Sequence, residues 1–233
     1  MTVRTRRLVT SGLMTAVMLA ILLGLGFWQL RRLKWKQGIL AEIASAEAAP
    51  AVALPPHPTR FEKVAITGRF HPGMAVFYAD EVRTLGPAIV QGAYWLAPLF
   101  RPGHRPVLVN LGWVPEAWHQ PLPAGTITVT GYVDPAGHRG WFAAKDNIAG
   151  RHFYTLDPHT IAQALDIGPV APYTLVALAG PAPSVPPAAP PFAATHLPRP
   201  PNNHFQYALT WFGLAGVLAV MFLKFAYDTR REG

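Results

Sequence analysis

The chain has 233 residues, of which 51% are hydrophobic and 14% are charged, and its formal net charge is +8. This length allows one mid-sized domain beside two apolar helices, and the composition favours a membrane protein. The absence of cysteine excludes disulfides, zinc–thiolate sites and Cys-x-x-Cys copper or redox chemistry. Basic residues gather beside the apolar runs without any nucleic-acid-binding motif, so anionic lipid head groups explain the charge better than nucleic acid does.

The first apolar run covers residues 8–30 and contains no charged side chain. At about 1.5 Å per residue, a helix of that length crosses a hydrocarbon layer of roughly 30 Å. We therefore predict a transmembrane helix at 8–30 after a cytoplasmic N-terminus at 1–7. A cleavable signal peptide is the alternative, but its apolar core usually has about 7–15 residues and ends in small residues. This run ends in Phe27, Trp28, Gln29 and Leu30.

The middle of the chain has the pattern of an extramembrane domain rich in strands. Residues 31–58 are expected to extend the first helix and then to form an Ala- and Pro-rich connector. Residues 59–179 hold short segments of β-branched and aromatic residues between turn clusters. These predict strands near 61–70, 75–83, 88–100, 106–114, 126–133 and 173–178. Asp157 before Pro158 has the signature of a helix start, so the expected fold is α+β.

The last part of the chain predicts a spacer and a second membrane span. Residues 180–203 are dominated by proline and alanine, which is typical of a stiff polyproline II linker that buries no core. An uncharged run predicts a transmembrane helix at 204–224, before a cytoplasmic tail at 225–233. The basic ends favour cytoplasmic termini and therefore a periplasmic domain. Four cations at positions 31, 32, 34 and 36 oppose this orientation, which suggests that they have another role.

Catalytic motifs are absent from the sequence. It contains no Gly-x-Ser-x-Gly, no His-Glu-x-x-His, no phosphate-binding loop and no cysteine nucleophile. Asp80 and Glu81 are an adjacent carboxylate pair, but alternation in a strand would point them to opposite faces, so we interpret them as solvated surface groups. An enzyme is therefore not expected.

Chemistry-bearing residues instead gather where the two predicted spans meet the outer boundary of the membrane. Helical spacing places two sets on one face each: Gly24, Trp28, Arg31, Arg32 and Trp35 on the first helix, and His204, Tyr207, Ala208, Trp211 and Ala215 on the second. An imidazole, aromatic walls and boundary cations are what haem requires for its iron, its ring and its propionates. The alternative is an aromatic belt with snorkelling cations, in which Asn202 and Asn203 cap the second helix.

Three segments, taken together, carry a family resemblance. They are Gly26-Phe-Trp-Gln-Leu-Arg-Arg-Leu-Lys-Trp-Lys36, Val109-Asn-Leu-Gly-Trp-Val-Pro115 and Pro201-Asn-Asn-His-Phe-Gln-Tyr-Ala-Leu-Thr-Trp-Phe-Gly-Leu-Ala215. With Gly68-Arg-Phe70 between the first two, they resemble the Surfeit locus protein 1 family over most of the chain. Leu111 departs from that family, which often has arginine at this position.

The resemblance implies a function and assigns roles to residues. Members of that family are membrane-bound assembly factors for haem–copper cytochrome c oxidase, with two spans around a domain outside the bacterial plasma membrane or in the mitochondrial intermembrane space. The implied cargo is haem a, bound transiently, and the implied partners are the catalytic subunit of the oxidase and haem a synthase. His204 matches the histidine of the motif, and is expected to bind the haem iron. Trp28, Tyr207 and Trp211 are expected to pack against the ring.

The boundary geometry adds Arg31, Arg32 and Lys36 as expected partners of the haem propionates.

The short basic segment ahead of the first span favours a bacterial plasma-membrane protein. We therefore expect a non-enzymatic assembly factor that binds haem a and assists its insertion into the oxidase. The second hypothesis is a scaffold that stabilises an oxidase assembly intermediate without ligating haem. A membrane enzyme acting on quinone or haem is a third hypothesis, disfavoured by the lack of paired acid and base groups.

Overall fold

The computed structural model describes residues 3–137, 140–141, 143–180 and 189–231. The chain forms two compact units. One consists of residues 1–42 with 199–233, and the other of residues 43–198.

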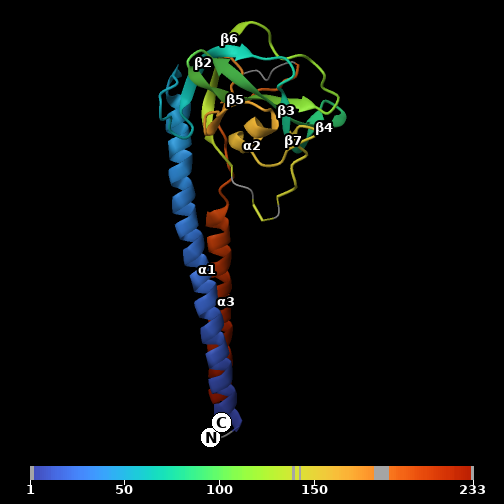
Figure 1. Ribbon diagram of the computed structural model, residues 1–233. Helices are drawn as coiled ribbons and strands as arrows, with labels where there is room; N and C mark the ends of the chain where they lie inside the picture. The colour runs from blue at the N-terminus through green and yellow to red at the C-terminus, as the bar shows by residue number, and fades with distance from the viewer. Residues whose placement is uncertain (1–2, 138–139, 142, 181–188, 232–233) are drawn as a thin grey trace. The chain divides into compact units, whose positions relative to one another are not determined.

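The first unit contains α3 (His204–Arg231) and, up to residue 42, the antiparallel helix α1 (Val3–Ala48) (Figure 1). Both are long and apolar enough to cross a membrane. A Cβ added to Gly12 would lie 3.3 Å from the Phe222 ring, whereas His204 contacts Gln29, so the start of α1 meets the end of α3. α1 continues without a break past the apolar run, as predicted for an extension of the first helix.

The second unit is built on one sheet. In the described residues its strands are β1 (Val52–Ala53), β2 (Lys63–Phe70), β3 (Val76–Leu85), β4 (Ala88–Arg101), β5 (His104–Pro115), β6 (Thr126–Pro135), β7 (His152–Phe153) and β8 (Tyr173–Ala177). Their order is β1-β2-β6-β8-β5-β4-β3-β7. The longer strands agree with the sequence predictions, because β-branched and aromatic residues between turn clusters are a strong local signal.

An additional pairing closes part of this sheet on itself. β2 pairs with β4 at Arg69↔Phe100 and Phe70↔Leu99, so β2, β6, β8, β5 and β4 form a small closed barrel. Side chains alternate along each strand, and one set fills the barrel interior. Val64, Trp95 and Val109 belong to this interior, and each is at most 3% exposed.

The outer side of β4 and β5 carries a second apolar cluster. Here α2 (Pro158–Ala164) packs Ile161 against Leu96, Leu108 and Phe153. Asp157 is the N-cap of α2 and accepts a hydrogen bond from the His159 backbone N–H, as the sequence predicted for this helix start.

Two predictions about connections need correction. The turn between β4 and β5 is shorter than the gap between the strands predicted near 88–100 and 106–114, because Arg101 pairs with His104 and leaves only Pro102 and Gly103 outside the ladder. Gly103 has φ +70°, a conformation that glycine adopts without strain.

The second correction concerns the Pro-rich linker. Residues 181–188 lie outside the described residues, but the prediction of a spacer is wrong for residues 189–198. Phe192 forms an antiparallel bridge with Trp113, and Ala194 pairs in parallel with Leu178. Leu197 is only 1% exposed. Proline richness did not prevent packing, because the backbone groups between the prolines still reach the sheet.

Candidate functional site

His204, the first residue of α3, makes a hydrogen bond to α1. Its Nδ1 lies 2.7 Å from Oε1 of Gln29. Because an amide oxygen can only accept, the His204 Nδ1 carries the proton in this arrangement. Gln29 is buried between the helices at 9% exposure. No role was predicted for it from the sequence. A glutamine within an otherwise apolar run was the signal that could have identified it.

Small residues allow the two helices to approach at this position. Ala208 and Ala215 are buried on the face of α3 that begins with His204. On α1, Gly26 lies one turn before Gln29, and a Cβ added there would come within 2.6 Å of the Phe212 ring. Small side chains at a helix interface permit close backbone contact, which is the usual way that membrane helices pair.

The predicted aromatic residues lie near His204, but they do not enclose it. Tyr207 is 55% exposed, and Trp211 is half-buried. The Nε1 of Trp211 is buried without a hydrogen-bond partner in the described part of the chain. Phe212, which the sequence analysis did not select, packs edge-on against Phe27 with ring centroids 5.3 Å apart.

The predicted face of α1 is not the face that meets α3. Leu22, Gly26 and Gln29 are the buried positions, and they recur at the three- and four-residue spacing of one helix stripe. Trp28 and Arg31 belong to the predicted face. Trp28 is 54% exposed, and Arg31 is exposed too. The two sets of sequence-selected residues therefore do not converge as expected. His204 contacts a different stripe of α1, roughly 140° around the helix axis from the predicted one.

The predicted cations remain accessible to a ligand or to lipid. Arg31 and Arg32 are exposed, and Lys36 is half-buried. The Arg32 guanidinium lies over the Trp35 ring at 4.0 Å from its centroid. Among the described residues, none of the three cations forms a salt bridge.

This arrangement provides one imidazole whose Nε2 makes no hydrogen bond to the described residues. The Nδ1 of this His204 ring is hydrogen-bonded to Gln29. A histidine that donates from one ring nitrogen to a fixed acceptor presents the lone pair of the other nitrogen in a fixed direction, which is how ligating histidines are held in metalloproteins. His204 and Gln29 could therefore supply one axial ligand to an iron.

The middle motif, Val109–Pro115, has a structural role. Asn110 accepts a hydrogen bond from the Gly112 backbone N–H, and the indole Nε1 of the buried Trp113 donates to the carbonyl of Glu81. Gly112 has φ +122°, and a Cβ there would lie 2.5 Å from the backbone of Phe192. Leu111 faces the barrel interior, so its departure from the family pattern is compatible with the fold.

The chain is similar to known proteins over nearly its whole length. A "SURF1-like protein" of Rickettsia felis is 28% identical over 220 residues, covering 91% of this chain and 95% of that protein. "Surfeit locus protein 1" of Mus musculus is 28% identical over 232 residues, covering 88% of this chain and 72% of the mouse protein. The corresponding human protein is 26% identical over 224 residues. The model of the SURF1 family matches residues 16–216, which include Gln29, His204 and the whole sheet. The chain belongs to the SURF1 family.

Proposed function

We propose that this protein is an assembly factor for haem–copper cytochrome c oxidase, which binds haem a through His204 and assists its insertion into the catalytic subunit. The observation that carries the proposal is the Gln29–His204 hydrogen bond between two helices of membrane-spanning length. It lies within the part of the chain that matches the SURF1 family.

His204 is the proposed ligand of the haem iron. Its Nδ1 is engaged by Gln29, so Nε2 is the atom available to a metal. A single firm ligand suits a carrier, because cargo held from one side can be passed to a subunit that offers its own ligand. Gln29 is a positioning residue that fixes the tautomer and the direction of the ring.

The surroundings of His204 fit the remaining parts of a haem. Tyr207 and the half-buried Trp211 offer aromatic surface on α3, and the exposed Trp28 offers aromatic surface on a different stripe of α1 from the one that His204 contacts. Arg31, Arg32 and Lys36 follow on α1, where they could pair with propionates at the membrane boundary. Their accessibility supports this role, and it fits anionic lipid head groups as well.

The proposed protein acts by binding and handing over rather than by catalysing a reaction. Its partners are the catalytic subunit of the oxidase, the enzyme that makes haem a, and the lipid bilayer. We place it in a bacterial plasma membrane, with both helices spanning and the sheet domain in the periplasm. The two apolar helices and the similarity to a Rickettsia protein support this placement.

A scaffold that stabilises an oxidase intermediate without ligating haem is the second candidate. The exposure of Trp28 and Tyr207 favours it, because exposed aromatics near helix ends are typical of residues that contact lipid or a neighbouring subunit. In that case the Gln29–His204 contact only holds the helices together.

The test is complementation of a strain that lacks the gene. We expect wild-type protein to restore oxidase activity and haem a in the purified catalytic subunit, and His204→Ala to lose most of both at equal expression. His119→Ala, which removes an exposed histidine of the sheet unit, should behave as wild type. Full restoration by His204→Ala would support the scaffold and exclude His204 as a required haem ligand.

A further inference from the structure

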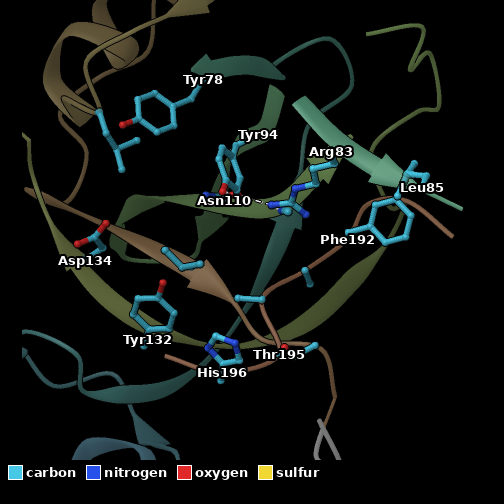
Figure 2. A pocket seen from close by; sticks show the side chains of 15 residues that line it. Tyr78, Arg83, Leu85, Tyr94, Asn110, Tyr132, Asp134, Phe192, Thr195 and His196 are labelled. Atoms are coloured by element: carbon cyan, nitrogen blue, oxygen red, sulfur yellow. Dashed lines mark hydrogen bonds between the residues drawn. The ribbon is translucent and has the colours of Figure 1, made fainter. Parts of the chain in front are cut away.

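A cavity of about 720 Å³ lies on the outer face of the small barrel, entirely within the sheet unit (Figure 2). We call it the Tyr–Asp cavity, and its polar and aromatic lining includes Tyr78, Arg83, Tyr94, Asn110, Tyr132, Asp134 and His196. Its volume falls within the range of about 300–1,000 Å³ that is common for pockets that bind small molecules. None of these residues was predicted from the sequence to bind a ligand, although Asn110 lies in the Val109–Pro115 motif, and none belongs to the His204 site.

Strand register builds the floor of this cavity. On β6, Tyr132 and Asp134 are two residues apart and therefore point to the same face. Val176 on β8 pairs with Tyr132 on one side and with Asn110 of β5 on the other. A row of side chains thus crosses three neighbouring strands outside the barrel. β3 and residues 192–196 contribute the other walls.

Three tyrosine rings line the cavity. Tyr78 and Tyr94 are cross-strand partners with ring centroids 6.2 Å apart, and their planes are tilted by 36°. Tyr132 is 8% exposed. Figure 2 shows Asp134 between Tyr78 and Tyr132, on the side of the cavity opposite Arg83. The face of a phenol ring is electron-rich and attracts cations.

The positive charge of Arg83 is already balanced. Its Nε donates to a Glu81 carboxylate oxygen at 2.8 Å, and its guanidinium also donates to the Tyr94 hydroxyl at 3.3 Å. The guanidinium lies over the Trp113 ring at 5.1 Å from the centroid. Arg83 is therefore fixed in the wall and does not neutralise the opposite side of the cavity.

Asp134 differs from Arg83, because no described residue forms a hydrogen bond or salt bridge with its carboxyl group. Asp134 is nevertheless partly buried. Burial raises the pKa of Asp134, and the charge of Arg60 opposes that rise. Burial also raises the pKa of Tyr132 and of Tyr78, and the Asp134 charge raises both further. A cation that enters beside a partly buried carboxyl group strongly stabilises its charged form, because little water is there to do so.

We propose that the Tyr–Asp cavity binds a small organic cation, an ammonium group joined to an apolar body. The ammonium group pairs with the Asp134 carboxylate between the rings of Tyr78 and Tyr132. The apolar body lies along Tyr94, Leu156 and Val176. This combination of one carboxylate with several aromatic faces is the chemistry that recognises amines. The proposal is independent of haem binding, because no residue of the His204 site takes part.

The test uses the full chain in detergent and two probes of nearly equal shape, phenethylammonium and the uncharged 2-phenylethanol. Isothermal titration calorimetry at neutral pH should show phenethylammonium binding roughly tenfold or more tightly than the alcohol, because only the cation forms a charge-assisted hydrogen bond with Asp134. Asp134→Asn should abolish this preference. Asp166→Asn removes an exposed carboxylate of the same unit and should leave the preference unchanged.

Either of two results would overturn the proposal. One is equal affinity of the wild type for the cation and the alcohol, which needs no variant and so does not depend on how a variant folds. The other is an unchanged preference in Asp134→Asn with a wild-type circular dichroism spectrum. Tyr132→Phe provides a further check. It keeps the ring and should retain most of the affinity, whereas Tyr132→Leu should lose it.

Discussion

Gln29 and His204 are two polar side chains joined inside a helix pair whose neighbouring contacts are apolar or small. A polar contact in such a place fixes which faces of the helices meet, because any rotation would leave an amide and an imidazole without partners. The same bond fixes the ring of His204. One interaction thus serves both the assembly of the helices and the direction of the proposed ligand.

Gln29→Ala tests this double role. We expect it to destabilise the helix pair by about 0.6 kcal/mol, the usual size of a hydrogen bond between membrane helices. Haem affinity should fall by roughly tenfold, the lower end of the effect of losing a residue that orients a metal ligand. Thermal unfolding and haem titration in detergent measure the two effects. Gln37→Ala removes an exposed glutamine of the same helix and should change neither.

Asp134 gives a pH-dependent prediction at the same scale. Its pKa is raised by burial, so the folded protein holds that proton more tightly than the unfolded chain does, and the associated stability is lost as pH rises through the folded pKa. The groups that face it or act on it are Tyr78, Tyr132, Arg60 and, across the cavity, the paired Arg83.

Asp134→Asn should therefore raise the unfolding temperature at neutral pH and leave it nearly unchanged at about pH 4. Thermal unfolding followed by circular dichroism at both pH values measures the difference. A variant that is less stable than wild type at neutral pH would show that Asp134 has a stabilising partner in the folded protein.

At the scale of elements, residues 189–198 show why composition misleads. The segment is rich in proline, yet Phe192 exchanges two backbone hydrogen bonds with Trp113, at 2.8 and 3.1 Å, and their rings lie 5.9 Å apart. Gly112 makes this possible, because its missing side chain leaves room for the Phe192 backbone. The family motif around Gly112 thus holds this segment against the barrel.

Gly112→Ala should destabilise the sheet unit by more than the roughly 1–3 kcal/mol that a strained backbone conformation costs, since the added methyl also meets Phe192. Gly103→Ala is the matched control: it places alanine at φ +70° with no atom within 4 Å of the new methyl. Chemical unfolding followed by tryptophan fluorescence compares the two. Equal losses of stability would mean that the contact with Phe192 does not determine the effect.

Sequence reasoning found those elements whose signal is local. Enrichment in β-branched and aromatic residues between turn clusters identified the long strands, and the Asp157–Pro158 pair identified the start of α2. The closure of the barrel by β2 and β4 has no such local signal, because it joins residues about 30 positions apart. The stripe of α1 that meets α3 was misjudged, since tryptophan and arginine are conspicuous in a sequence while Gly26 and Gln29, which make the contact, are not.

At the scale of the whole molecule, the account requires two membrane crossings with both termini on one side. α1 and α3 are long and apolar enough, and they are antiparallel. The exposed Arg31 and Arg32 then lie on the outer side against the usual preference of basic residues for the cytoplasm. A function in binding haem propionates would explain that placement.

Cysteine labelling can test the topology directly, because the natural chain contains no cysteine. We expect Ala117→Cys, an exposed position of the sheet unit, to react with a membrane-impermeant maleimide in cells whose outer membrane has been made permeable. Asp228→Cys, exposed near the end of α3, should react only after the inner membrane is opened. The reverse pattern would place the sheet unit in the cytoplasm and remove the proposed route of haem transfer.

The most direct test of the central claim is the absorption spectrum of the protein purified from cells that synthesise haem a. The account predicts that wild type and His119→Ala carry haem a, and that His204→Ala at equal expression does not. Haem a in His204→Ala at the wild-type level would contradict the account. So would its absence from wild type that still copurifies with the catalytic subunit of the oxidase, and the scaffold would then be the better description.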